Sequence, residues 1–252
     1  MTELAYLADL PSAYVRDFRG RITALPPGAI VLDRTYFYPT GGGQPADRGT
    51  LRLPGGEDLS VVDVTKSGPS VVHRIHGSPS AIRSLAVGLE LEGTIDWERR
   101  HRHMRLHTAQ HLLSARLFTR YRVRTRRAEL SGLTATLDLE GAISAEELAP
   151  LADDLREAGT LPRPVRVRFV PRAEWDRNPN SERSGLVPLP RQVDPVRVVE
   201  IEATDACPCG GTHVRSTGEI GAVTLAPPAP IAGGASRVVF TIEPVGPPIP
   251  PA

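Results

Sequence analysis

Short hydrophobic or alternating runs, broken by Gly and Pro, fill the first part of the chain. Such runs occupy residues 30–32, 59–64 and 71–75, and turn-forming segments such as PPG, PTGGGQPADRG and SGPS separate them. Strands this short, with turns this frequent, are typical of a small barrel or sandwich. We therefore expect residues 1–92 to form a β-barrel-like domain.

The pattern changes to a helical period after Thr94. Asp96 is a suitable N-cap for a helix from residue 97 to about residue 120. The apolar positions at helical spacing are Met104, Ala109, Leu112, Leu113 and Leu117. Two strands then flank a turn at Ser131 and Gly132. A second amphipathic helix opens at Ser144, with Glu147 completing a capping box, and ends at Gly159.

The rest of the chain mixes strands and loops without strict alternation. We expect a strand at 165–170, a long loop at 171–195, and a strand that runs into a loop with cysteine and histidine. Strands near 222–225 and 238–243 follow. The fold class is therefore α+β, with a second domain over residues 93–245 and a disordered Pro-rich tail over residues 246–252.

Composition narrows the class of protein. The chain has 252 residues, 40% of them hydrophobic and 23% charged, and a formal net charge of +1. A near-neutral total argues against a DNA-coating protein, although it can hide a local basic face. We find no run of about 18 apolar residues and no secretory signal at the N-terminus, so we expect a cytoplasmic protein without a membrane partner.

Cysteine and histidine spacing points to a metal. Cys207 and Cys209 are separated by one residue, where a disulfide is strained, so they indicate metal ligands or reactive thiols. His107 and His111 lie four apart in the predicted helix, which places their Cβ atoms on one face about 6 Å apart. His213 follows Cys209 by four residues, with two glycines between them. His, His, Cys and His together suit one zinc ion.

The ligand set alone leaves the reaction open. Thr108 stands where a metalloprotease of the H-E-x-x-H class has its glutamate, which argues against that class. Four protein ligands also suit a closed, structural zinc site, whereas catalysis needs an open or weakly held position. Each half of the set also has a simpler interpretation, as helical histidines without a metal or as a buried free cysteine.

Five segments together resemble a known family. They are RRHRHMRLHTAQHLLSA, CPCGGTHVRSTGEI, PTGGGQPADRG, VRVVEIEATD and GASRVVFTIE, and they span roughly residues 35–243. They are similar to the editing domain of alanyl-tRNA synthetases and closer to the free-standing AlaX family, in its medium-length type with the glycine-rich motif. The resemblance implies a β-barrel-like domain followed by the editing domain shared with threonyl-tRNA synthetases.

The resemblance also implies a function. The chain would act in trans on charged tRNA(Ala) and hydrolyse the ester of a wrong amino acid, with serine as main substrate and glycine as second. The ligands of one Zn²⁺ would be His107, His111, Cys209 and His213, with Cys207 a neighbour. We expect a monomer without an adenylation domain. The alternatives are a zinc-stabilised tRNA-binding module without catalysis and a deacylase of another mischarged tRNA.

Further residues are candidates for selection and binding. The hydroxyl of Thr108 would favour serine over alanine, unless it only packs the helix. The glycine loop, Gly41, Gly42 and Gly43, allows close approach to a ligand, unless it is only a turn. Glu129 and Asp205 are carboxylates suited to hold metal-bound histidines, unless they are surface or turn residues.

Two arginine clusters are candidates for contact with the tRNA backbone, unless they are solvated surface. The first cluster lies at the start of the predicted helix and comprises Arg99, Arg100, Arg102 and Arg105. In the second, every second residue is arginine, which in a strand would place them on one face; its members are Arg120, Arg122, Arg124 and Arg126. We expect Arg122 and Arg124 to bind tRNA.

Overall fold

The computed structural model describes residues 1–178 and 189–244. It divides into two units, Met1–His101 and Arg102–Ala252, and each is described by itself. The predicted Pro-rich tail, and residues 179–188 of the predicted long loop, lie outside the described residues. Within the described residues, no helix is long and apolar enough to cross a membrane.

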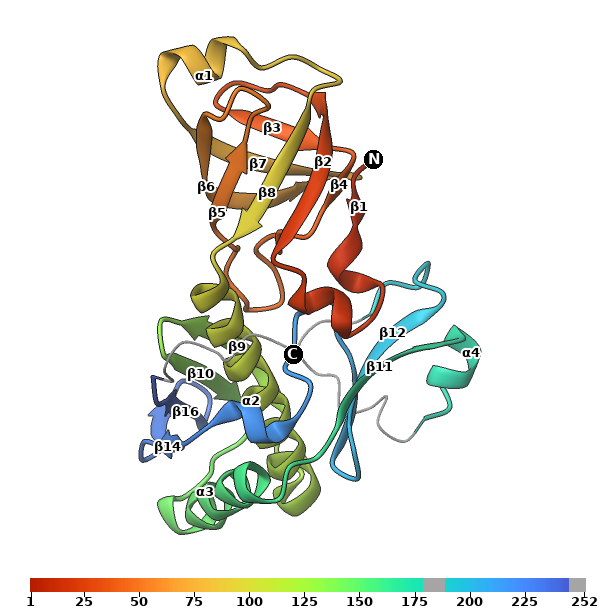
Figure 1. Cartoon of the computed structure of the whole chain (residues 1–252). Helices are drawn as coiled ribbons and strands as arrows, with labels where there is room; N and C mark the ends of the chain where they lie inside the picture. Colours follow the sequence, from red (N-terminus) through yellow and green to blue (C-terminus); the bar gives the residue numbers. More distant parts are fainter. Residues whose placement is uncertain (179–188, 245–252) are drawn as a thin grey trace. The chain divides into compact units, whose positions relative to one another are not determined.

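The first unit is a ring of six strands (Figure 1). They are hydrogen-bonded in the order β2-β3-β7-β6-β5-β8, and β8 pairs back with β2, which closes the sheet into a barrel. The strands are β2 (Asp17–Ala24), β3 (Ala29–Leu32), β5 (Gly49–Arg52), β6 (Asp58–Ser67), β7 (Ser70–His76) and β8 (Glu90–Ile95). The short helix α1 (Pro79–Arg83) precedes β8, and β1 (Glu3–Leu4) pairs with β4 (Arg34–Thr35). Two 3-10 turns, Ala5–Leu7 and Pro11–Tyr14, lie between β1 and β2.

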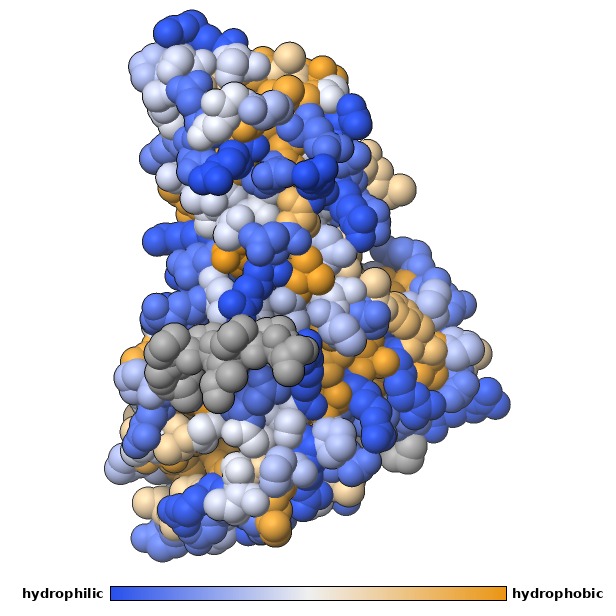
Figure 2. Space-filling view, in the orientation of Figure 1, coloured by the Kyte–Doolittle hydropathy of each residue, from blue (hydrophilic) through white to orange (hydrophobic). Residues whose placement is uncertain are grey.

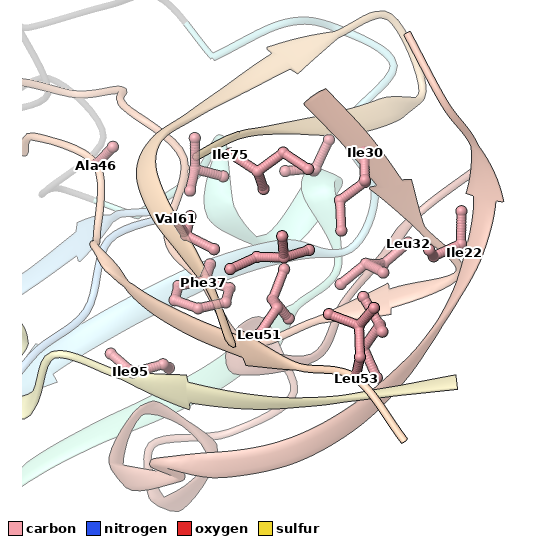
Figure 3. Packing of buried hydrophobic residues seen from close by; sticks show 14 of the residues in the cluster. Ile22, Ile30, Leu32, Phe37, Ala46, Leu51, Leu53, Val61, Ile75 and Ile95 are labelled. Carbon is pink, nitrogen blue, oxygen red and sulfur yellow. The ribbon is translucent and has the colours of Figure 1, made fainter. Parts of the chain in front are cut away.

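Alternation along the strands separates the two sides of this ring. β8 alternates exposed and buried positions, so Leu91 and Ile95 face inward while Glu90 and Glu92 face outward and pair with Arg19 of β2. Such charged positions contribute to the blue surface in Figure 2. Inside the ring, side chains such as Ile30 and Leu51 point toward one another (Figure 3). Removing these apolar side chains from water is the main force that stabilises this unit.

The long helix α2 (Trp97–Tyr121) confirms the predicted helix almost to the residue. Asp96 caps it, since its Oδ1 accepts a hydrogen bond from the Arg99 amide at 3.1 Å. The helix ends where Arg122 adopts a φ of 59°, with its amide bonded to the carbonyl of Phe118. Residues up to His101 belong to the first unit and the rest to the second.

The second unit combines two sheets with helices, which is a mixed α/β arrangement. One sheet has the order β14-β16-β10-β9, with β15 also paired to β16, and the other has the order β11-β12-β13. The strands are β9 (Thr125–Ser131), β10 (Thr134–Leu139), β11 (Val165–Val170), β12 (Val196–Ile201), β13 (Asp205–Pro208), β14 (Val223–Leu225), β15 (Ala229–Ile231) and β16 (Ala235–Ile242). A 3-10 turn, Thr217–Ile220, precedes β14.

Of the two helices after β10, the first begins where capping predicts and the second was not expected. α3 (Ala145–Thr160) opens with the capping box of Ser144 and Glu147, as expected from the sequence. α4 (Arg172–Trp175) was not expected, because it lies in the segment predicted as loop. Four residues are too few to show a helical period, so the pattern could not reveal it.

The three-stranded sheet has two different faces, and this positions the site. On one face, Val196 and Val198 of β12 pack against Trp175. Residues alternate between faces, so the opposite face carries Arg197, Val199 and Ile201 of β12. The register pairs Ile201 with Asp205 and Val199 with Cys207, which places these β13 residues on that same face.

Candidate metal centre

Four ligand side chains converge in the second unit. His107 and His111 lie one turn apart on α2, both buried, with ring centroids 5.2 Å apart. Cys209 follows β13 directly, and His213 lies at the end of the glycine turn. One donor atom from each of the four lies within 4.8 Å of the others. The spacing H-x-x-x-H therefore meets C-x-x-x-H in space, as the sequence predicts.

The distances between the donor atoms suit an ion with tetrahedral coordination. The sulfur of Cys209 lies 3.6 Å from Nε2 of His107 and 3.3 Å from Nε2 of His213. Around zinc, with Zn–S about 2.3 Å and Zn–N about 2.0 Å, tetrahedral geometry separates sulfur and nitrogen by about 3.5 Å. Three imidazoles and one thiolate are also ligands of the right chemistry. The residues present therefore fit a metal of the zinc type.

The carboxylate of Asp205 orients His111. Oδ2 of Asp205 lies 3.1 Å from Nδ1 of His111, and both side chains are buried. A carboxylate accepts a hydrogen bond, so Nδ1 donates and the lone pair of Nε2 is left to face the cluster. The contact places Asp205 beside one of the four converging side chains.

Thr108 orients His213 in the same way. Its hydroxyl lies 3.2 Å from Nδ1 of His213, donates to the Met104 carbonyl at 2.9 Å and accepts from the Val214 amide at 3.2 Å. These contacts use the one donor and two acceptor positions of a hydroxyl. A substrate hydroxyl can reach Thr108 only by replacing one of these partners.

Arg197 also supports the centre, although its sequence pattern does not predict this. Its guanidinium is buried and Nη1 donates to the carbonyls of Cys209 and Gly211, while its own carbonyl accepts from the Cys209 amide. The Gly211 amide in turn contacts the Cys209 sulfur at 3.2 Å. Arg197 therefore holds the turn that presents Cys209 and His213. Its signal in the sequence was only an arginine within a strand.

The electrostatics favour a thiolate. Burial raises the pKa of Cys209, but the nearby imidazoles of His107, His213 and His111 outweigh it and hold the pKa well below 9. Burial also lowers the pKa of His213 well below 6.5, and His107 lowers it further. A thiolate beside a neutral imidazole is the protonation state in which both groups bind a metal.

Cys207 stays outside the cluster. It is half-exposed, and its sulfur lies 3.7 Å from the carbonyl of Pro208. Among the described residues, the group of converging ligands includes Cys209 but not Cys207. The geometry therefore agrees with the choice of Cys209.

Glu129 does not hold a ligand histidine, so the prediction from the sequence is wrong for this residue. It lies exposed on β9 and pairs with Arg127 at 3.1 Å. An exposed carboxylate engaged by an exposed arginine does not hold a buried histidine. Alternation explains the difference, since Ala128 and Leu130 take the buried face and leave Glu129 in solvent.

The prediction that Arg100 and Arg105 contact tRNA is wrong, because both side chains are buried. Arg100 binds the carboxylate of Asp47 and the carbonyls of Ala13 and Tyr36. Arg105 binds the carbonyls of Ile220 and Glu243, and burial lowers its pKa. Neither guanidinium is placed to meet tRNA.

The other arginines remain at the surface in part. Arg99 and Arg102 are half-buried, and Arg99 donates to the Ala46 carbonyl. Arg122 is exposed and Arg124 half-buried, and both guanidinium groups lie within 6 Å of the Phe118 ring. The prediction that they share a strand face is wrong, since β9 begins only at Thr125.

The glycine loop is a tight turn in the first unit. Gly42 and Gly43 have φ of 57° and 82°, and Gly41 and Gln44 exchange backbone hydrogen bonds on either side. Two consecutive positive φ values are the geometry of a type I′ turn, which glycine adopts without strain. Asp47 fixes the base of the loop by accepting from the Tyr38 amide at 2.6 Å.

Comparisons with known proteins agree with this site. Residues 196–238, which include Cys209 and His213, match the family described as the threonyl and alanyl tRNA synthetase second additional domain. Residues 14–99 match the class II (A) tRNA synthetases. Over 97% of its length the chain is 33% identical to the whole of the alanyl-tRNA editing protein AlaX-M of Saccharolobus solfataricus.

The chain belongs to the AlaX family. Alanine–tRNA ligases are also similar: that of Pyrobaculum neutrophilum is 36% identical over 95% of the chain, and that of Methanopyrus kandleri 41% identical over 84%. The chain spans 28% and 23% of these two ligases, so it matches a part of them. Its alignment with the AlaX protein, in contrast, covers both partners almost end to end.

Proposed function

We propose that this chain hydrolyses the ester of mischarged alanine tRNA, with serine as the main amino acid removed and glycine as the second. As a member of the AlaX family it is an aminoacyl-tRNA deacylase, which is a hydrolase. The observation that carries the finer proposal is the buried cluster of His107, His111, Cys209 and His213. Cys209 and His213 lie within residues 196–238, which match the additional domain of threonyl- and alanyl-tRNA synthetases.

We propose zinc as the metal, held by these four residues, one ion per chain. Zinc supplies a Lewis acid that polarises an ester carbonyl or holds water or the substrate's amino group. The chain's own residues prepare the ligands: Asp205 accepts from His111, Thr108 contacts His213, and Arg197 fixes the turn of Cys209. The four donors lie within 4.8 Å of one another, so one ion would contact all of them.

Selection of serine is proposed for Thr108. It follows His107 on α2, and its hydroxyl lies 3.2 Å from Nδ1 of His213, one of the four proposed ligands. A site built around a hydrogen bond to a substrate hydroxyl rejects the analogue that lacks it, here alanine. The substrate hydroxyl would take the place of one present partner of Thr108. Gly41, Gly42 and Gly43 are kept as the proposed second element of selection, because a bare backbone admits close approach.

Binding of tRNA is proposed for the exposed arginines. Arg122 and Arg124, with Arg99 and Arg102 in part, offer guanidinium groups at the surface for sequence-independent contact with phosphates. We propose that residues 93–245 carry the chemistry, that the chain acts as a monomer, and that it works in the cytoplasm on charged tRNA.

A deacylation assay combined with tRNA binding tests this proposal. Labelled serine on tRNA(Ala) and on tRNA(Ser) is incubated with zinc-loaded protein, while filter binding measures each complex. Release from tRNA(Ala) alone supports the proposal. Binding without release from either tRNA would favour a non-catalytic module, and release from tRNA(Ser) alone would favour a deacylase for another tRNA.

A further inference from the structure

One cross-strand row joins the candidate metal centre to the edge of the three-stranded sheet. The register pairs Phe169 of β11 with Arg197 of β12. The Cys209 amide bonds to the Arg197 carbonyl, so Cys209 continues the row on the far side of Arg197. Residues opposite one another share a face, so the three side chains lie on the face that carries Asp205.

Phe169 is exposed on this face. About half of its surface, 49%, is accessible, and it is the only aromatic residue in the exposed class among the described residues. Its neighbours on the same face, Val167 and Cys207, are half-exposed. Hydrophobic surface is visible where β11 and β12 lie (Figure 2). Phe169, Val167 and Cys207 therefore form a small apolar strip on this face.

The row sets the distance from the metal centre. Neighbouring strands lie about 4.8 Å apart, so Phe169 stands about 10 Å from Cys209, two strand spacings away. In an aminoacyl-tRNA the ester is made on the terminal ribose, which also carries the terminal base. The base on that ribose lies about the length of one nucleoside from the ester carbonyl. Phe169 therefore stands at a distance from the centre that this base can reach.

We propose that Phe169 is the stacking platform for the terminal adenine of the aminoacyl-tRNA, an inference that rests on the proposed function. Aromatic side chains stack on bases without regard to sequence, and such a contact is worth about tenfold in affinity or more. Arg197 lies between, but its side chain is buried and its Nη1 donates to two carbonyls of the Cys209 turn. Phe169 is therefore the accessible planar side chain of this row, while Val167 extends the apolar surface beside it.

The chemistry around Phe169 favours a base over a phosphate. The arginines of β11, Arg166 and Arg168, alternate onto the opposite face and pair with Glu202 and Glu200. The Phe169 face thus gains no positive charge from its own strand. An uncharged, planar group is the partner that this surface accepts.

Calorimetry with two non-hydrolysable probes tests the inference. The first probe is 3′-(L-seryl)amino-3′-deoxyadenosine, in which an amide replaces the ester, and the second is the same seryl-amino ribose without a base. Zinc-loaded wild type is compared with Phe169→Ala, with Phe169→Tyr, and with Leu161→Ala, which removes another exposed apolar side chain of the same unit. Zinc content is measured for every variant.

The wild type should bind the adenine-bearing probe about tenfold more tightly than the baseless one. The affinities of Phe169→Ala for the two probes should differ by no more than about twofold, and its zinc content should be normal. Phe169→Tyr and Leu161→Ala should keep the preference for the adenine-bearing probe. If Phe169→Ala keeps the preference for the adenine-bearing probe, or if the wild type shows no such preference, the stacking role is wrong. A change in oligomeric state on Phe169→Ala would also overturn it, by assigning the surface to a second copy.

The same proteins separate this inference from the proposed function. Wild type that releases serine from tRNA(Ala) while Phe169→Ala keeps its base preference refutes the stacking role alone. Wild type that releases no serine refutes the proposed function and the inference together. Release by the wild type, with a raised KM and little change in kcat for Phe169→Ala, supports both.

Discussion

The carboxylate of Asp205 lies against the imidazole of His111, with 3.1 Å between Oδ2 and Nδ1. The two residues are 94 positions apart and both are buried. Their contact ties α2, which carries His107 and His111, to the start of β13, the strand that directly precedes Cys209. It also fixes which nitrogen of His111 faces the cluster.

Replacing Asp205 should weaken the metal centre. Asp205→Asn keeps the size of the side chain but removes the charge that holds the Nδ1 proton of His111. Loss of such a partner costs about 10- to 100-fold in metal affinity. Competition with a chromophoric chelator measures the zinc affinity. Glu129→Gln is the matched control, because Glu129 is an exposed carboxylate on β9, and its affinity should equal that of the wild type. Equal affinity for both variants would remove Asp205 from the centre.

The two cysteines should behave differently. Cys209→Ala removes the thiolate nearest His107 and His213, so the purified protein should lose zinc and serine release together. Cys207→Ala removes a sulfur outside the cluster and should keep most of both. Zinc per chain after dialysis, measured by atomic emission, decides between them. The reverse ranking would show that Cys207 is the ligand.

Thr108 should control the choice between serine and alanine. Thr108→Val keeps the shape and removes the hydroxyl, so the ratio of kcat/KM for seryl- over alanyl-tRNA(Ala) should fall by at least about tenfold. Thr108→Ser keeps the hydroxyl and should preserve the ratio. Rates are taken at saturating zinc. If Thr108→Val binds zinc more weakly but keeps the ratio of kcat/KM values, the role of Thr108 is limited to orienting His213.

His73 should make the first unit sensitive to acid. Burial lowers the pKa of His73 to about 4, although its bond to the Ile30 carbonyl opposes this, and its Nε2 lies 2.9 Å from the Thr35 hydroxyl. The unfolded chain takes up the proton below about pH 6.5, whereas the folded one does so only below about 4. Stability is therefore complete above pH 6.5 and falls as the pH drops from 6.5 to 4.

A shift from 6.5 to about 4 amounts to about 3 kcal/mol of unfolding free energy at full extent. Urea denaturation at pH 7 and pH 4.5 measures it on zinc-free wild type and on His73→Gln. The variant starts from a lower stability but should lose less of it between the two pH values. An identical loss in both proteins would show that other groups cause the acid sensitivity.

Local signals let the sequence predict the regular elements. Asp96 caps α2, and Ser144 with Glu147 caps α3, and both signals act within one turn of the chain. The ligand pairs are equally local, since His107 and His111 share a helix face whatever the tertiary fold. The sequence did not show how the two ligand pairs meet, because their meeting depends on contacts between residues about a hundred positions apart.

Long-range burial explains what the sequence could not reveal. Arg100 and Arg105 read as surface charge because their partners, Asp47 and the carbonyls of Ile220 and Glu243, lie 53 to 138 positions away. Arg197 stands in a strand whose two faces are both covered, so alternation gave no reason to place it inward. The arginine spacing suggested a strand that includes Arg122 and Arg124. Instead, α2 ends at Tyr121, Arg122 has a positive φ, and β9 begins only at Thr125.

We propose that the cluster of His107, His111, Cys209 and His213 supports removal of serine from alanine tRNA. The most direct measurement is release of labelled amino acid from tRNA(Ala) charged with serine, glycine or alanine, with and without a zinc chelator. We predict rapid loss of serine and slower loss of glycine, with alanine retained. Chelation should abolish release, and added zinc should restore it. Retention of all three amino acids, or loss of serine that a chelator leaves unchanged after zinc is shown to be gone, would contradict the account.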